Sequence, residues 1–154
     1  MSDGIDLVGL VEELPARARG RACILLTHDY AGQKQWAEQL ASQTNSGQLD
    51  LLDLFASDAQ LAGSVQEFSV VRLFEHLAGY GEKPVLIISG LEFLKATWSG
   101  LPSASEEFAS QVETWRGTPA LLFVMQYDKA LETRNFTRYP QYDFVIDQRE
   151  TIKL

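Results

Sequence analysis

Three short apolar runs in this sequence are each followed directly by polar residues that could carry chemistry. The run at 22–27 precedes the stretch HDYAGQK, the run at 85–88 precedes SGLE, and the run at 120–125 precedes QYD. Apolar runs without alternation are typical of parallel strands that are buried on both faces of a sheet. Because ligands bind at the carboxyl ends of such strands, the three polar stretches predict one common site.

The stretch from Thr27 to Lys34 occupies the place of a phosphate-binding loop, whose usual pattern is G-x-x-x-x-G-K-[ST]. Gly32 matches the second glycine of this pattern. Thr27 stands at the first glycine, Gln33 at the lysine, and Lys34 at the hydroxyl residue. Gln33, expected to face the loop cavity, cannot neutralise phosphate, and Lys34 stands where Mg²⁺ needs a ligand. Backbone amides, a displaced Lys34 and His28 could still hold phosphate weakly. An ordinary strand–turn–helix without a ligand is the alternative.

The other two stretches suggest further site residues. Ser89 stands where the Mg²⁺-binding aspartate of a Walker B strand would be. Glu92 could polarise water as a catalytic residue, or it could simply stabilise a helix N-terminus. Gln126 stands where related ATPases place a polar sensor of the γ-phosphate. ATP with Mg²⁺ is therefore expected to bind weakly or not at all.

A polar loop near the C-terminal end carries Arg134 and Arg138. These residues are candidates for binding a partner or for acting as arginine fingers on a neighbouring subunit; solvated loop arginines are the alternative. No metal site is predicted, because the two histidines, His28 and His76, are far apart in the sequence. The lone Cys23 lies inside an apolar run and is expected to pack rather than to react.

The composition predicts a single cytoplasmic domain spanning residues 1–154. Apolar residues make up 45% of the chain and charged residues 22%, no apolar run approaches the length of a membrane span, and no secretory signal is visible. The net charge of −8 disfavours autonomous binding to DNA. Nucleic acid is therefore expected only through a complex, and the expected partners are larger proteins or further copies of the chain.

Helix-type and strand-type patterns alternate along the chain. Helices are predicted at 7–14, after Gly32, from Ser64 to Leu77 and from Ser103 to Trp115, the last two from capping-box spacing. Further strands are predicted at 49–55, where the pattern also suits a helix, and at 144–146. This order predicts an α/β fold, a three-layer αβα sandwich with a mainly parallel sheet like that of P-loop NTPases. The runs at 22–27, 85–88 and 120–125 should be its central strands.

The order of these elements, with the segment RYPQYD at 138–143, resembles the small BrxF-type P-loop proteins of BREX bacteriophage-defence systems. More broadly, the chain resembles the AAA+ and RecA-like cores. The first resemblance implies a component of a multiprotein antiviral system. With both nucleotide motifs altered, the expected function is a non-catalytic interaction subunit that binds nucleotide weakly or not at all. The alternatives are an active ATPase that uses Lys34 and Glu92, and a DNA-processing adaptor related to DnaA or to clamp loaders.

Overall fold

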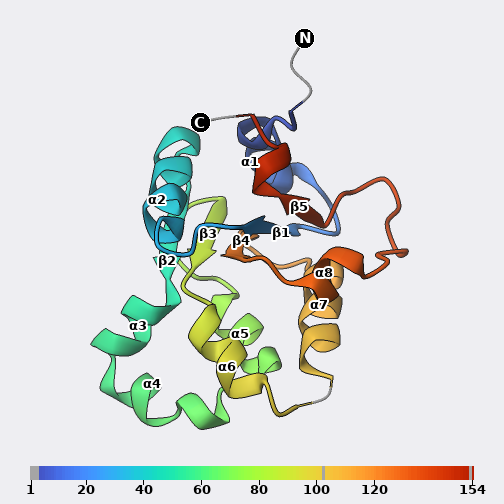
Figure 1. Ribbon diagram of the computed structural model, residues 1–154. Coiled ribbons are helices and arrows are strands. Elements are labelled where there is room, and N and C mark those ends of the chain that lie inside the picture. Colours follow the sequence, from blue (N-terminus) through green and yellow to red (C-terminus); the bar gives the residue numbers. More distant parts are fainter. Residues whose placement is uncertain (1–3, 102, 153) are drawn as a thin grey trace.

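Five strands form one parallel sheet in the order β2-β3-β4-β1-β5 in the computed structural model, which describes residues 4–101, 103–152 and 154. The strands are β1 (Ala22–Thr27), β2 (Gly47–Asp50), β3 (Val85–Ser89), β4 (Ala120–Gln126) and β5 (Val145–Asp147). Helices cover both faces of the sheet (Figure 1). The predicted α/β class and the parallel sheet are confirmed.

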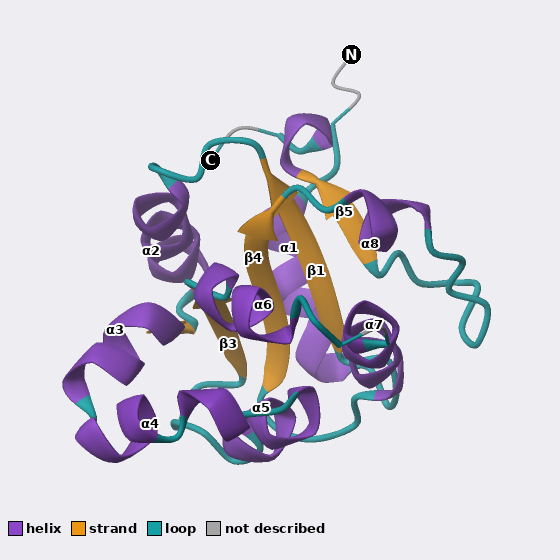
Figure 2. Cartoon of the chain, turned by 60° about the horizontal axis from the view of Figure 1, so that its bottom comes forward, coloured by secondary structure: helices purple, strands orange, loops and turns teal. Residues whose placement is uncertain are grey.

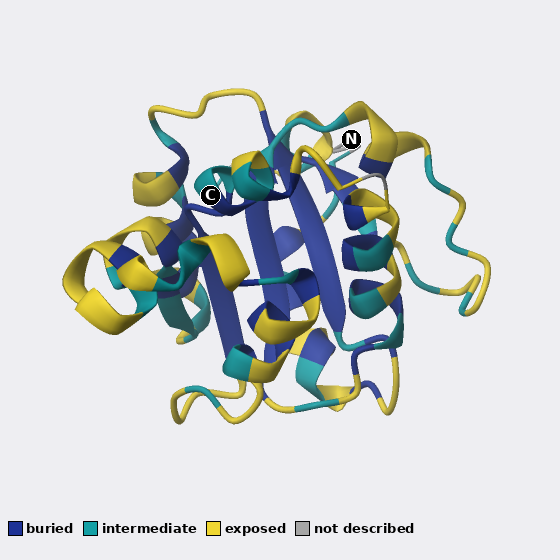
Figure 3. Ribbon diagram, turned by 90° about the horizontal axis from the view of Figure 1, so that it is seen from below, coloured by how far each residue is buried: buried dark blue, intermediate teal, exposed yellow. Residues whose placement is uncertain are grey.

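The three apolar runs form the interior strands β3, β4 and β1, which lie side by side in Figure 2. All their residues are buried except Gln126, which is half-buried, and Figure 3 shows these strands as the buried centre of the molecule. Burial on both faces explains why their sequences do not alternate between apolar and polar residues. Cys23 is fully buried and packs in the core as expected, and this burial raises the pKa of its thiol to about 12.

Alternate strand residues contribute to two apolar clusters, one on each face of the sheet. One face is covered by α1 (Leu7–Glu13) and α2 (Gln33–Thr44). The other is covered chiefly by α5 (Val70–Leu77), α6 (Glu92–Trp98) and α7 (Ala104–Thr114). The remaining helical segments are α3 (Leu51–Ser57), α4 (Ala59–Gly63), α8 (Lys129–Thr133), η1 (Leu14–Ala16), η2 (Val65–Glu67) and η3 (Gln148–Glu150). Within the described residues, none of these helices is long and apolar enough to cross a membrane.

The predicted strand at 49–55 is wrong in most of its length. The strand β2 ends at Asp50, and residues 51–57 form α3. The carboxylate of Asp50 accepts a hydrogen bond of 3.0 Å from the backbone amide of Asp53, which caps the helix N-terminus. Leu51 and Phe55, four residues apart, are then both buried on one face of α3. Capping and helical burial therefore outweighed the strand-like apolar run.

The helix predicted to start at Ser64 starts five residues later. The hydroxyl of Ser69 accepts a hydrogen bond of 3.2 Å from the amide of Arg72 and caps α5. Ser64 instead donates back to the carbonyl oxygens at the end of α4. The helix predicted from Ser103 is confirmed, because α7 begins immediately after that residue, although the side chain of Ser103 makes no capping hydrogen bond.

Candidate functional site

The carboxyl ends of β1 and β4 lie side by side, and the chain leaves these two strands towards opposite faces of the sheet. Thr27 at the end of β1 is paired in register with Gln126 at the end of β4. Helix α2, which follows β1, packs on one face of the sheet, whereas α8, which follows β4, packs through Leu131 on the other. Such a divergence leaves a crevice where ligands bind in parallel sheets. The three predicted polar stretches meet at this edge.

The loop between β1 and α2 supplies its own anion. Gly32 is the N-cap of α2, as predicted, and its amide donates a hydrogen bond of 3.2 Å to the carboxylate of Asp29. The carboxylate lies so close that a Cβ atom added to Gly32 would be 2.7 Å from it. A helix N-terminus stabilises negative charge, and here Asp29 provides that charge. A phosphate group at this position would therefore compete with Asp29.

Gln33 and Lys34 both form contacts within the protein. Gln33 is only 2% exposed, and its side-chain oxygen accepts a hydrogen bond of 3.1 Å from the amide of Gly90, in the turn after β3. The ammonium of Lys34 forms an ion pair with Asp53 on α3, and this contact raises the pKa of Lys34. Neither residue presents an unpaired cation to the loop, which is what a nucleotide phosphate requires.

A carboxylate reaches the Walker B position from a neighbouring strand. The hydroxyl of Ser89, at the end of β3, donates a hydrogen bond of 2.8 Å to Asp50, at the end of β2. The other oxygen of Asp50 caps α3 through Asp53, so both oxygens are engaged. The sequence reading missed Asp50 because it placed this residue inside a strand; the Asp-x-x-Asp spacing was the available signal for a cap. No His, Cys, Asp and Glu side chains of the described residues form a group suited to hold a metal ion.

Glu92 connects the start of α6 to the end of β4. One of its carboxylate oxygens accepts a hydrogen bond of 2.7 Å from the backbone amide of Gln126. Its other oxygen, the side-chain oxygen of Gln126 and the side-chain nitrogen of Gln33 are buried without a partner among the described residues. Unpaired buried polar atoms cost about 1–3 kcal/mol each. The edge therefore offers one donor and two acceptors to water or to a small polar ligand.

His28 is held by β5 and does not line the loop cavity. Its Nε2 lies 2.9 Å from a carboxylate oxygen of Asp147, and its ring stacks on Tyr127 at 5.1 Å between centroids. Arg149 donates to the same carboxylate through its guanidinium and its backbone amide. Burial alone would raise the pKa of Asp147, but the hydrogen bonds from Arg149 and His28 hold it well below its usual range. The sequence prediction also missed Asp147, although it ends the strand β5 at the carboxyl edge of the sheet.

The depressed pKa of Asp147 predicts a pH-dependent contribution to stability. A carboxyl group whose pKa falls on folding stabilises the protein above its unfolded pKa of about 3.9, and this stabilisation is lost as the pH falls towards the folded value. Asp147→Asn should therefore lower the free energy of unfolding by about 1–3 kcal/mol at pH 7. Urea unfolding should show the deficit shrinking below about pH 4. Asp143→Asn, which changes an exposed carboxylate, is the control. A stability deficit of Asp147→Asn that is equal at pH 7 and below about pH 4 would contradict the assignment.

The cavity beside the loop is small. It has a volume of about 100 Å³ and is lined by Thr27, Asp29, Gly32, Gln33, Trp36 and Gln148. Sites for drug-sized ligands and cofactors usually measure about 300–1,000 Å³. Together with the engaged side chains of the loop, this volume does not fit a nucleoside triphosphate with Mg²⁺.

The two loop arginines have different environments. The guanidinium of Arg134 pairs with Glu106 at 2.6 Å and with Glu113 at 3.3 Å, and it lies over the ring of Phe136. Arg138 donates its backbone amide to Glu113 at 3.0 Å, while the residue itself is exposed. Arg134 therefore anchors the loop, and Arg138 is the arginine presented to solvent.

The sequence matches no protein-family model, and no curated protein is significantly similar to it.

Proposed function

We propose that the chain is a non-catalytic, P-loop-like interaction subunit of a multiprotein bacterial system. The observation that carries this proposal is the loop after β1, where the carboxylate of Asp29 binds the helix N-terminus. The buried amide side chain of Gln33 stands where a lysine would bind phosphate. Because the Gly32 amide already has a carboxylate partner within the protein, this loop can hold its conformation without nucleotide.

Exposed apolar and basic side chains support an interaction role. Tyr30, Leu52, Leu101 and Ile152 are exposed although they are large and apolar, and Arg138 is exposed on the loop before β5. The segment at 138–143 also carries the resemblance to BrxF-type proteins. We therefore place the subunit in an antiphage defence system, where it contacts nucleic acid only through its complex because its own charge is −8.

Purified protein is expected to hydrolyse ATP negligibly. Competent phosphoryl-transfer enzymes turn over at about 1 s⁻¹ or faster, whereas this loop lacks both the phosphate-binding lysine and a free Mg²⁺ ligand. Steady-state phosphate release with ATP and Mg²⁺ is the measurement. Turnover near 1 s⁻¹ that Glu92→Gln abolishes and the exposed control Glu75→Gln leaves intact would contradict the proposal.

Affinity purification from the native host, followed by mass spectrometry, tests the interaction itself. We expect co-purification of larger proteins encoded by neighbouring genes. Arg138→Ala should reduce their recovery, whereas Arg116→Ala, which removes an exposed arginine after α7, should not. Recovery of the chain alone would contradict an interaction role.

A second candidate function, an ATPase with displaced motif residues, is favoured by one observation. The unpaired buried atoms of Gln33, Glu92 and Gln126 all lie at the ligand-binding edge, where a polar ligand would satisfy them. Steady-state hydrolysis of ATP that Gln126→Leu lowers would support this candidate over the first. Binding of ADP or ATP in isothermal titration calorimetry alone would not separate the two, because weak nucleotide binding is compatible with both.

A further inference from the structure

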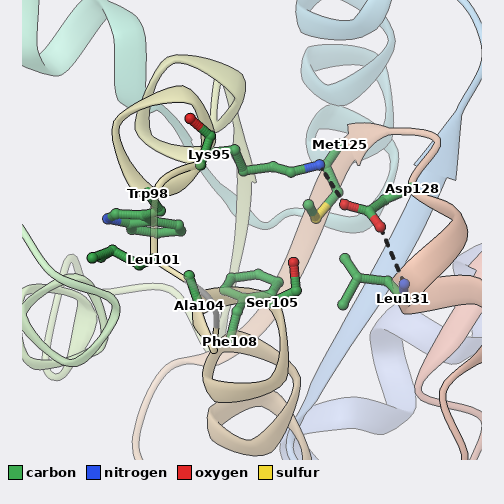
Figure 4. Close-up of a pocket in the computed structure, with 10 residues that line it drawn as sticks. Lys95, Trp98, Leu101, Ala104, Ser105, Phe108, Met125, Asp128 and Leu131 are labelled. Carbon is green, nitrogen blue, oxygen red and sulfur yellow. Dashed lines mark hydrogen bonds and ion pairs between the residues drawn. The ribbon is translucent and has the colours of Figure 1, made fainter.

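A pocket of about 120 Å³ opens between α6, α7 and α8, on the face of the sheet opposite α2 (Figure 4). The function proposed above does not use it. Its apolar wall is formed by Trp98, Phe108, Met125 and Leu131, all of which are buried. Lys95, Leu101, Ser105 and Asp128 also line it, as Figure 4 shows. We refer to it as the α6–α7–α8 pocket.

The size and lining of the α6–α7–α8 pocket suit one aromatic ring. A cavity of about 150 Å³ lined by aliphatic and aromatic side chains can hold benzene, so about 120 Å³ accepts a group of similar size but not a whole cofactor. The aromatic rings of Trp98 and Phe108 and the thioether of Met125 make favourable contacts with a further ring. The geometry therefore selects a single group of about the size of one ring.

An ion pair lies at the rim of the α6–α7–α8 pocket. The ammonium of Lys95 is 2.7 Å from one carboxylate oxygen of Asp128, and both side chains are partly exposed. The other oxygen of Asp128 accepts from the amide of Leu131 and caps α8. Burial alone would raise the pKa of Asp128, but the contact with Lys95 lowers it, so the carboxylate stays charged. This carboxylate is thus the negative charge at the rim that a cation of a partner would contact.

Leu101 indicates that the occupant extends beyond the pocket. It is 57% exposed, the highest value among the exposed large apolar residues of the described part. A single ring held in the pocket leaves most of this side chain in solvent, whereas a protein segment that crosses the mouth of the pocket also covers it. A pocket with a buried aromatic wall and an exposed leucine at its mouth suits the anchor site of a protein interface.

Charge decides which protein occupies the pocket. Two copies of this chain would each carry a net charge of −8 and repel each other, whereas a basic partner is complementary. We propose that the α6–α7–α8 pocket binds an aromatic side chain of a basic partner segment, whose neighbouring lysine or arginine pairs with Asp128. This inference rests on the proposed interaction function and specifies the chemistry of the partner.

Met125 provides a direct readout of occupancy. The chain contains only two methionines, Met1 and Met125, so methyl-¹³C-methionine labelling yields two signals, and Met125→Leu assigns them. The probe is a synthetic peptide with one phenylalanine between two Lys-Lys pairs and glycine spacers. We expect a saturable shift of the Met125 signal. Replacing the phenylalanine with glycine should weaken binding about tenfold or more, and added salt should also weaken it.

Matched variants separate the pocket from the rest of the surface. Ser105→Tyr places a ring at the mouth of the pocket and should abolish the shift. Ser110→Tyr is the control, because Ser110 is exposed on the same helix but does not line the pocket. Lys95→Met should tighten peptide binding about two- to fivefold, because it leaves Asp128 free for the lysines of the peptide.

Four results would overturn the inference. The first is a Met125 signal that the peptide leaves unchanged, and the second is equal binding of a peptide with glutamate in place of lysine. The third is binding of free phenol as tight as that of the peptide. The fourth is a dimer in analytical ultracentrifugation that Leu101→Ser dissociates. The third would identify a small-molecule site and the fourth a second copy of the chain. The proposed function would fail on different results, namely ATP turnover by the purified protein or recovery of the chain without partners. Failure of the pocket proposal is therefore distinguishable from failure of the proposed function.

Discussion

Phe108→Ala is expected to lower the free energy of unfolding by about 3–5 kcal/mol. Phe108 is buried on α7, and its ring lies 5.0 Å from that of Phe123 and 5.7 Å from that of Phe74. Removing the ring loses these contacts and leaves a cavity in the core between the helices and the sheet. Because domains are typically stable by only 5–15 kcal/mol, the variant should be close to its stability limit.

Urea unfolding followed by circular dichroism measures this change, and Tyr30→Ala is the matched control. Tyr30 is also aromatic but is 53% exposed in the loop after β1, so its removal should change stability by about 0.5 kcal/mol or less. A loss below about 1 kcal/mol for Phe108→Ala would mean that α7 does not pack on the sheet as described.

Arg134→Met is expected to destabilise the protein by about 2–4 kcal/mol. It removes the guanidinium that pairs with Glu113, whose side chain is only 8% exposed. Breaking a buried pair by removing one partner leaves an uncompensated charge and typically costs about 3–5 kcal/mol; the lower range reflects the partial exposure of Arg134 and the remaining hydrogen bond from the amide of Arg138. The contribution of the exposed Glu106 should be small.

Arg138→Met is the matched control for this change. Arg138 is exposed and contacts Glu113 only through its backbone, so stability should change by about 0.5 kcal/mol or less. Thermal or urea unfolding of both variants makes the comparison. Equal stability of the two variants would contradict the anchoring role of Arg134, while partner recovery lost only with Arg138→Met would assign the interaction to the exposed arginine.

The two arginines show how far the sequence could predict the candidate site. Their pattern identified a polar loop, and both were equal candidates for a partner contact. Only the position of Glu106 and Glu113 on α7 distinguishes them, because this helix approaches the loop from 21 to 28 residues away in the chain. Local sequence contains no information about which charged side chain meets which.

The sequence alone determined the interior of the sheet and the position of the loop. β1, β3 and β4 were predictable because strands buried on both faces need uninterrupted apolar residues, and Gly32 was predictable as the start of α2. At 49–55 the sequence was ambiguous between strand and helix, and the cap formed by Asp50 and the burial of Leu51 and Phe55 decided for the helix.

The tertiary structure alone decided the chemistry of the carboxyl edge. Gln33 meets Gly90 across 57 residues, Ser89 meets Asp50 across 39, and His28 meets Asp147 across 119. These contacts depend on the strand order β2-β3-β4-β1-β5, which places distant strand ends next to one another. Residue patterns reveal which segments become buried strands, because burial is a local requirement on side chains, but the partners of polar groups at the strand ends follow from the order in which those strands pack.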